Sequence, residues 1–297
     1  MTIQAKNKTI QRPEWLPRGV WPYEIRSAVV DGTPIAYTDE GSGRVLLLIH
    51  DGMWSYVWGQ LIGSLRDRFR VVTLDFPGSG LSPESSAHPP SLNGDSKLVE
   101  AFVETLDIQK TTVVAHDIGG AVGVGFAARR PDLVEGLVLV NTFAWPPHVA
   151  ALTTMFRVMT SSPVRALNTG TNLVPKLTSG RFGIGRHLDA PERHAFLGGF
   201  RERAARHRFH DMMSAVRNET AYLAKVEEAL SSTLSEKPAL TIYGEKNDPF
   251  GFQEKFAQYL TNVEEMVIAG GNHFSMADDP HGVAERIASW HEAKLQA

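Results

Sequence analysis

The sequence contains no cysteine, so disulfide bonds, thiolate metal sites, iron–sulfur clusters and cysteine nucleophiles are excluded. It also lacks an excess of charge of one sign, since 30 lysines and arginines stand against 33 aspartates and glutamates, for a net charge of −3. Nucleic-acid and membrane-surface proteins usually show a basic excess, and we expect neither kind of partner. No apolar run reaches about 18 residues, and the N-terminal segment is polar, which predicts a cytoplasmic globular protein without a signal peptide.

Short apolar runs typical of buried strands alternate with helical patterns along most of the chain. This alternation favours an α/β fold, with a mostly parallel sheet covered by helices on both faces. The expected strands are 23–31, 34–39, 45–49, 71–74, 112–115, 137–140, 239–243 and 265–268, and the expected helices are 54–66, 94–106, 118–130, 252–260 and 280–294.

The stretch 145–236 interrupts the alternation, because it contains helical patterns and no convincing strand. We expect it to form a helical cap inserted after the sixth strand, between two parts of one core at 1–144 and 237–297. Ligands of open α/β sheets bind beyond the carboxyl ends of the strands, so a cap at that edge encloses a pocket.

One junction between a predicted strand and a predicted helix carries a carboxylate. Residues 112–120 are Thr-Val-Val-Ala-His-Asp-Ile-Gly-Gly, an apolar strand followed by small-X-Asp-X-Gly. This pattern is typical of a nucleophile elbow in which Asp117 replaces the usual serine. Ala115 and Gly119 supply the small neighbours that so tight a turn needs. An ordinary helix N-cap is the alternative, since aspartate is a common capping residue.

Two further polar residues follow later strands and complete a catalytic set. Asp248 comes after the strand 239–243, and His273 follows the last strand behind a glycine pair. The order nucleophile, acid, base is that of α/β-hydrolases, and all three residues lie where strands end, so we expect them to converge. Asp51 and Gly52 follow the strand 45–49, where these enzymes place an oxyanion-hole turn.

Residues 23–289 resemble the α/β-hydrolase superfamily, and within it the aspartate-nucleophile branch of haloalkane dehalogenases and epoxide hydrolases. The similarity is greatest to haloalkane dehalogenases of the third subfamily. Besides the motifs above, it rests on Trp-Ser-Tyr at 54–56, Leu-Arg-Asp-Arg-Phe-Arg at 65–70, Asn-Thr-Phe-Ala-Trp-Pro at 141–146 and Phe-Arg-Val-Met at 156–159.

A carboxylate nucleophile restricts the substrate, because attack on a saturated carbon gives a stable alkyl ester whereas attack on an acyl carbon gives an anhydride. We expect Asp117 to form the ester, neutral His273 to activate water, and Asp248 to orient His273. The backbone N–H groups of Ile118 and Gly52 then hold the oxyanion. The resemblance implies hydrolysis of a carbon–halogen bond or an epoxide in a small, mostly apolar substrate.

The leaving group distinguishes the two reactions. The resemblance implies that a halide is held by N–H donors, usually a tryptophan after the nucleophile with an asparagine in the oxyanion turn or a cap tryptophan. Here Ile118 follows the nucleophile, and the turn contains Asp51, a negative charge. The replacement donors that we expect are Trp54, Trp145 and Asn141, with packing as the alternative role of the tryptophans.

An epoxide leaves as an alkoxide and needs acidic donors, which the resemblance places on two cap tyrosines. The cap contains only Tyr222, so a second donor has to be a histidine such as His148, His207 or His210. A third hypothesis is a ligand-binding homologue that has lost turnover. Five apolar cap residues are expected either to line the substrate cavity or to pack between helices: Met155, Phe156, Met159, Phe196 and Phe200.

Three other patterns are better explained without a cofactor, metal or nucleic acid. The glycines at 119, 123 and 125 suit close packing of a helix on a sheet, because a dinucleotide motif belongs in the first βαβ unit. His207 and His210 have no nearby carboxylate to complete a metal site. The basic run 201–210 is interrupted by acidic residues and predicts a solvated cap surface. We expect a small-molecule substrate and either a monomer or a homodimer.

Overall fold

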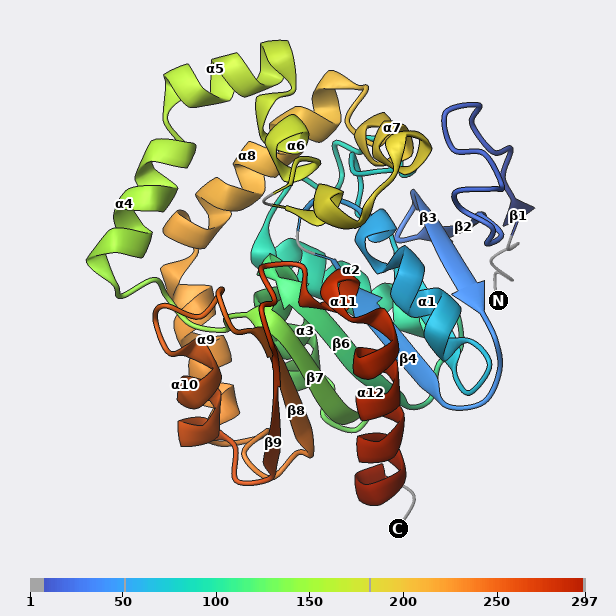
Figure 1. Ribbon diagram of the computed structural model, residues 1–297. Helices are drawn as coiled ribbons and strands as arrows, with labels where there is room; N and C mark the ends of the chain where they lie inside the picture. Colours follow the sequence, from blue (N-terminus) through green and yellow to red (C-terminus); the bar gives the residue numbers. More distant parts are fainter. Residues whose placement is uncertain (1–7, 51, 182, 296–297) are drawn as a thin grey trace.

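The computed structural model describes residues 8–50, 52–181 and 183–295, which fold around a nine-stranded sheet (Figure 1). The first three neighbouring pairs, β1–β2, β2–β3 and β3–β5, are antiparallel. All other neighbouring pairs of the sheet, among β5, β4, β6, β7, β8 and β9, are parallel. The predicted α/β class is confirmed. In spatial order the strands are β1 (Lys8–Thr9), β2 (Arg26–Val30), β3 (Thr33–Glu40), β5 (Arg70–Leu74), β4 (Val45–Ile49), β6 (Thr111–Asp117), β7 (Val134–Thr142), β8 (Ala239–Gly244) and β9 (Val263–Ile268).

The central parallel strands are apolar along their whole length because helices cover both of their faces. Every residue of β4 and of β8 is buried. Helices α1 (Gly59–Leu65) and α12 (Pro280–Leu295) pack together in front of the sheet in Figure 1, and α2 (Leu92–Thr105) and α3 (Ile118–Arg129) pack together behind it. Helix α10 (Phe252–Tyr259) packs on the edge formed by β8 and β9.

The observed elements differ from the predicted ones at a few boundaries. The predicted helix 54–66 begins as a 3-10 turn, η1 (Ser55–Trp58), in which the Val57 N–H reaches the Trp54 carbonyl. All four of its side chains are buried, so packing of bulky residues determines the local geometry. The two-residue strand β1 and the one-turn helix α11 (Ser275–Asp278) are too short to give a periodic signal.

Between β7 and β8 the chain forms a series of helices, most of which lie over the carboxyl ends of the strands (Figure 1). No helix in the described ranges is both long and apolar enough to cross a bilayer. The inserted elements are α4 (Ala150–Met159), α5 (Ser162–Thr171), α6 (Leu173–Thr178), η2 (Ile184–His187), α7 (Ala190–Gly198), α8 (Arg203–Asn218) and α9 (Thr220–Leu230).

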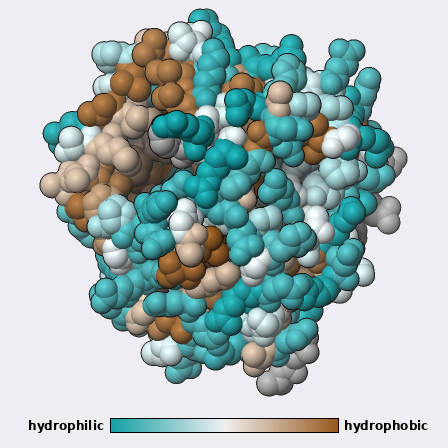
Figure 2. All heavy atoms as spheres, in the orientation of Figure 1, coloured by the Kyte–Doolittle hydropathy of each residue, from teal (hydrophilic) through white to brown (hydrophobic). Residues whose placement is uncertain are grey.

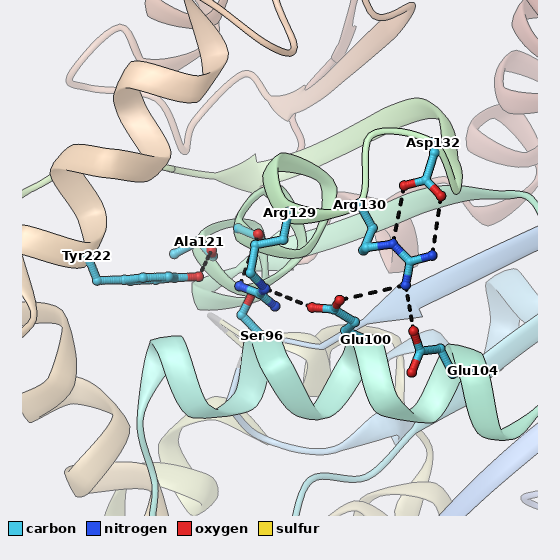
Figure 3. A network of polar contacts seen from close by, with 9 residues as sticks. Ser96, Glu100, Glu104, Ala121, Arg129, Arg130, Asp132 and Tyr222 are labelled. Carbon is cyan, nitrogen blue, oxygen red and sulfur yellow. Dashed lines mark hydrogen bonds and ion pairs between the residues drawn. The ribbon is translucent and has the colours of Figure 1, made fainter.

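Polar contacts hold α2, α3 and α9 together behind the sheet (Figure 3). Arg129 of α3 donates to Glu100 of α2 at 2.8 Å, and Arg130 donates to Glu104 one turn further along α2. Nearer the start of α3, the Tyr222 hydroxyl of α9 donates to the main-chain oxygen of Ala121 at 2.9 Å. Helix α9 therefore belongs to the layer that covers the sheet, although the chain reaches it from the cap.

A buried ion pair attaches the cap to this layer. Arg208 of α8 donates to the carboxylate of Asp95 in α2, and both side chains are only 3% exposed. At the junction of α8 and α9, Glu219 accepts the backbone N–H groups of Leu92 and Asn93 at the start of α2. Because the first N–H groups of a helix have no partner within the helix, this carboxylate both caps α2 and anchors the end of α8.

We predict that Asp95→Ala lowers the free energy of unfolding by about 3–5 kcal/mol, because it leaves the Arg208 guanidinium buried without its counter-charge. Urea denaturation of the purified protein measures the loss. Glu285→Ala is the matched control, since Glu285 pairs with Arg68 at the surface, where their side chains are 73% and 38% exposed. That control should cost less than about 1 kcal/mol. Equal losses in the two variants would contradict the assigned role of the buried pair.

Candidate active site

Asp117 lies at a strained turn between β6 and α3. Its φ is 48°, a left-handed conformation that non-glycine residues rarely adopt. A Cβ atom on Gly119 would lie 2.5 Å from the carbonyl oxygen of Ile49, and one on Gly120 would overlap the Thr142 hydroxyl. The small residues of the elbow motif are therefore required, because the ends of β4 and β7 press against this turn.

The structure brings together Asp117 and His273, the nucleophile and the base of the predicted triad. His273 Nε2 lies 3.8 Å from Asp117 Oδ2, and the two side chains are 34% and 23% exposed. This separation exceeds a hydrogen bond and leaves both groups accessible to a molecule in the cavity. The other ring nitrogen, Nδ1, lies 3.3 Å from Asn247 Nδ2.

Asp248, the predicted acid, lines the same cavity but makes different contacts. Its Oδ1 accepts the backbone N–H of Phe252 at 2.7 Å, and its Oδ2 accepts that of Gln253 at 2.9 Å. These are first-turn amides of α10, so the carboxylate caps this helix. The sequence order indicated Asp248, whereas the side chain at His273 Nδ1 is that of its neighbour Asn247.

Asn141 fixes the loop that carries His273. Its Nδ2 lies 3.0 Å from the Asn272 carbonyl oxygen, 2.8 Å from the His273 carbonyl oxygen and 2.8 Å from Ser275 Oγ. Its Oδ1 accepts the Gly244 N–H at 3.0 Å. One amide at the end of β7 thus links the loop after β9 to the end of β8, and its N–H groups are committed to these acceptors.

His116 also contacts the loop that carries His273. Its Nε2 lies 2.8 Å from the His273 carbonyl oxygen, and because a carbonyl can only accept, Nε2 carries the proton. Burial, together with repulsion from a charged His273, lowers the pKa of His116 to about 3. His116 is therefore a neutral, buried donor at ordinary pH.

The predicted oxyanion turn after β4 adjoins the start of α3. Gly52 has a φ of 81°, and a Cβ placed on it would meet Ile118 Cδ1 at 3.7 Å. Asp51 lies outside the described residues. Behind this turn the buried Asp75 carboxylate accepts the N–H groups of Ser55 and Leu81, each at 2.8 Å, while desolvation raises the pKa of Asp75 to about 6. Asp75 therefore ties the loops after β4 and β5 together.

The tryptophans proposed as halide donors are buried and make other contacts. Trp54 Nε1 donates to the Phe196 carbonyl oxygen at 3.0 Å. Trp145 packs edge-on against Phe252 with ring centres 5.3 Å apart, and Lys255 Nζ lies 4.3 Å from its ring centre. The structure therefore places Trp54 and Trp145 in packing roles and uses the Asn141 amide to hold loops.

The residues proposed as acid donors for an epoxide also have partners elsewhere. The Tyr222 hydroxyl is bonded to α3, as described above. His210 Nδ1 lies 3.1 Å from the Met159 carbonyl oxygen, His207 contacts Arg165, and His148 is 62% exposed beside Glu227. Among the described residues that line the cavity, none of these side chains occurs.

The cavity beside Asp117 has a volume of about 320 Å³ and is lined by both polar and apolar side chains. Met155 and Phe156, both proposed from the sequence, line it, whereas Met159, Phe196 and Phe200 pack in the interior. The other apolar lining residues were not predicted from the sequence, although most follow a strand end or belong to α4 and α8. The lining residues are Asp117, Asn141, Thr142, Phe143, Leu152, Met155, Phe156, Met213, Tyr243, Asn247, Asp248, Pro249, Phe250, Phe252 and His273.

Comparison with known proteins supports the fold and the class of chemistry. The family model described as alpha/beta hydrolase fold matches residues 45–280, and the chain belongs to this family. Haloalkane dehalogenase 2 of Mycobacterium tuberculosis is 29% identical over 279 residues, which cover 90% of this chain and 95% of that protein. These relationships support a hydrolase of the haloalkane dehalogenase kind.

Two further relatives show how far the similarity extends. The crystal structure of a putative ancestral haloalkane dehalogenase superposes with a TM-score of 0.78 at 22% identity, over 92% of this chain and all of that one. A cis-3-alkyl-4-alkyloxetan-2-one decarboxylase of Xanthomonas campestris is 27% identical over 278 residues, which cover 85% of this chain and 90% of that protein. The same architecture therefore occurs in proteins named for different reactions.

We predict that Asn141→Ala loosens the loop 270–275, because it removes the donors to two main-chain carbonyls and to Ser275. Hydrogen–deuterium exchange followed by mass spectrometry should show amide exchange in this loop faster by at least about tenfold. Asn168→Ala is the matched control: Asn168 is also fully buried, and its Oδ1 accepts the Val174 N–H within the cap. The control should speed exchange near Val174 and leave 270–275 unchanged, whereas unchanged exchange of 270–275 in Asn141→Ala would refute the anchoring role.

Proposed function

We propose that this protein is a hydrolase that attacks a saturated carbon of an apolar substrate through Asp117 and releases a stable anion, with halide as the favoured leaving group. The observation that carries the proposal is the approach of His273 Nε2 to Asp117 Oδ2, at 3.8 Å, in a cavity that is also lined by apolar side chains. The similarity to haloalkane dehalogenases supports the same chemistry.

In the first step an Asp117 carboxylate oxygen bonds to the substrate carbon, and the carbon–halogen electron pair departs with the halide. The product is an alkyl ester of Asp117. In the second step His273 Nε2 takes a proton from water, and the hydroxide adds to the ester carbonyl carbon. The backbone N–H groups of Ile118 and Gly52 are the proposed donors to the oxyanion.

Collapse of this intermediate breaks the bond between the ester carbonyl carbon and the alkyl oxygen. The departing alkoxide takes the proton from His273, and the carboxylate of Asp117 is restored with one oxygen from water. The balance is alkyl halide plus water giving alcohol, halide and a proton. Water can reach the ester because His273 lies beside Asp117 without a direct hydrogen bond between the two side chains.

The sequence assigned the orientation of His273 to Asp248 alone, and we propose that two neighbouring residues share this task. We assign orientation of the imidazole to Asn247, which contacts Nδ1, and anchoring of this segment to Asp248, whose two oxygens hold the first turn of α10. A neutral amide orients the ring but contributes less than a carboxylate to the stability of a charged imidazole.

The contacts of the side chains around the cavity favour a leaving group that needs no proton. An alkoxide from an epoxide requires an acidic donor, and the hydroxyl of Tyr243, which lines the cavity, already donates to the Thr142 carbonyl oxygen. Burial also raises the pKa of Tyr243 well above its usual value. Halides and carboxylates leave as stable anions and need no such donor. The site therefore favours a substrate with a halide or carboxylate leaving group over an epoxide.

A second candidate follows from the same reasoning and from the similarity to the oxetanone decarboxylase. Asp117 attacks the ring carbon that bears the lactone oxygen, and the carbon–oxygen bond opens to a carboxylate. The bond to this carboxylate then breaks with loss of carbon dioxide, its electron pair forms the alkene, and the ester carbon–oxygen bond returns its electrons to Asp117. This sequence consumes no water and does not require His273 as a base.

The decisive experiment uses His273→Phe and measures intact mass after incubation with 1-bromoalkanes, 1,2-epoxyalkanes and a cis-3,4-dialkyl β-lactone. For a bromoalkane we expect an added alkyl group on Asp117 that persists, because the base that hydrolyses the ester is missing. Asp117→Asn should form no adduct and should lose turnover by at least about 10³-fold. An epoxide adduct would indicate epoxide hydrolysis, and alkene release by His273→Phe would indicate lactone decarboxylation. A wild-type protein that binds members of the panel without adduct or turnover would identify the non-catalytic homologue.

Asn247→Asp tests the assignment at His273 Nδ1. A negative charge beside this nitrogen stabilises the protonated ring. The low-pH limb, which is the part of the pH–rate profile where ester hydrolysis slows because His273 becomes protonated, should therefore move to higher pH by about 1 unit. Single-turnover rates between pH 5 and 9 measure the shift. Asp248→Asn is the companion variant and should leave this limb in place while it weakens α10. If Asp248→Asn moves the limb downward and Asn247→Asp does not move it, Asp248 is the orienting group.

A further inference from the structure

The cavity opens to solvent between α4 and the loop that joins β8 to α10. Met155 of α4 and Phe250 of this loop both line the cavity, yet their side chains are 48% and 39% exposed. Leu152 and Phe156, which precede and follow Met155 on α4, line the cavity from buried positions. The boundary between cavity and solvent therefore runs across Met155 and Phe250.

An apolar stripe along α4 continues from the cavity to the surface. Leu152, Met155 and Val158 are spaced by three residues, so each side chain is the neighbour of the next on the helix surface. Their exposed fractions are 8%, 48% and 55%, which rise from the cavity outward. Figure 2 shows hydrophobic side chains gathered at the upper left, over the region of α4 and α5, beside a recess.

A series of aromatic rings connects α4 with the loop after β8. Phe156 and Phe143 have ring centres 6.4 Å apart, Phe143 and Phe252 lie at the same separation, and Phe252 and Phe250 are 5.7 Å apart. The last ring of this series is the exposed Phe250. Apolar side chains that line the cavity thus reach solvent both on α4, at Met155, and on the loop after β8, at Phe250.

We infer that the substrate carries a linear alkyl chain longer than the cavity, whose distal methylenes lie on a mouth strip formed by Met155, Val158 and Phe250. This inference rests on the proposed attack by Asp117, which places the reactive carbon at the inner end. A cavity of about 320 Å³ is at the small end of ligand pockets, so a long chain extends past Met155. The strip removes these methylenes from water, and the exposed side chains gain burial at the same time.

A chain-length series tests the inference by turnover. The substrates are 1-bromoalkanes of four to twelve carbons, with 1,2-epoxyalkanes as a parallel series, and kcat/KM is measured for each. We expect kcat/KM to rise with every added methylene beyond the length that fills the cavity, by up to about fourfold per methylene. Values of kcat/KM that level off or fall once the cavity is full would overturn the inference.

Matched charge substitutions locate the effect. Val158→Glu places a charge on the strip and should lower the ratio of kcat/KM for the ten-carbon and four-carbon substrates by about tenfold. Val29→Glu is the control, because Val29 is 58% exposed on β2, at the opposite side of the molecule in Figure 1 from α4. This control should keep the wild-type ratio. If the two variants have equal ratios of kcat/KM for the ten-carbon and four-carbon substrates, the mouth strip does not bind substrate.

A binding measurement separates failure of this inference from failure of the proposed chemistry. Isothermal titration calorimetry with 1-alkanols of four to ten carbons requires no reaction at Asp117. We expect the Kd to fall with chain length in the wild type and in Val29→Glu, and to fall less steeply in Val158→Glu. If alkanols show this pattern and no halide or epoxide reacts, the strip stands and the proposed reaction is wrong. A Kd independent of chain length overturns the strip whatever the turnover.

Discussion

The side-chain amide of Asn141 is the contact on which the arrangement of the site depends. Its oxygen holds the end of β8, and its nitrogen holds two consecutive carbonyls and a hydroxyl in the loop after β9. The backbone of Asn141 has a φ of 39°, so the chain adopts an unfavourable conformation to present this amide. The position of the imidazole relative to Asp117 follows from this junction, because His273 has its own carbonyl held between Asn141 and His116.

Charge is distributed unevenly around this junction. His116 is buried and neutral, Asn247 is neutral, and Asp248 is engaged by the positive end of α10. Asp117 and His273 are the partly exposed pair that faces the apolar walls. Among the described contacts of the imidazole, Asn247 contributes a neutral amide at Nδ1, and Asp117 contributes a carboxylate 3.8 Å from Nε2.

The sequence predicted the sheet, the cap and the elbow because each leaves a local signature. Continuous apolar runs mark strands covered on both faces, and Gly119 is needed wherever the first helical turn touches a neighbouring strand. The roles of Asn141, Asn247 and Trp54 were not predictable in the same way. Their partners lie on segments far away in the chain, so only the folded arrangement shows which donor meets which acceptor. The exposure of Met155 depends likewise on what the cap leaves uncovered.

The two ends of the inserted segment are attached to the core with unequal strength. Helix α8 buries eight residues, and α9 is bonded to α3, whereas α4 buries only Leu152 and Phe156. Local opening follows the region with the fewest buried contacts. The inserted segment is therefore held to the core mainly through α8 and α9, while α4, at the side where the cavity meets solvent, contributes only two buried residues.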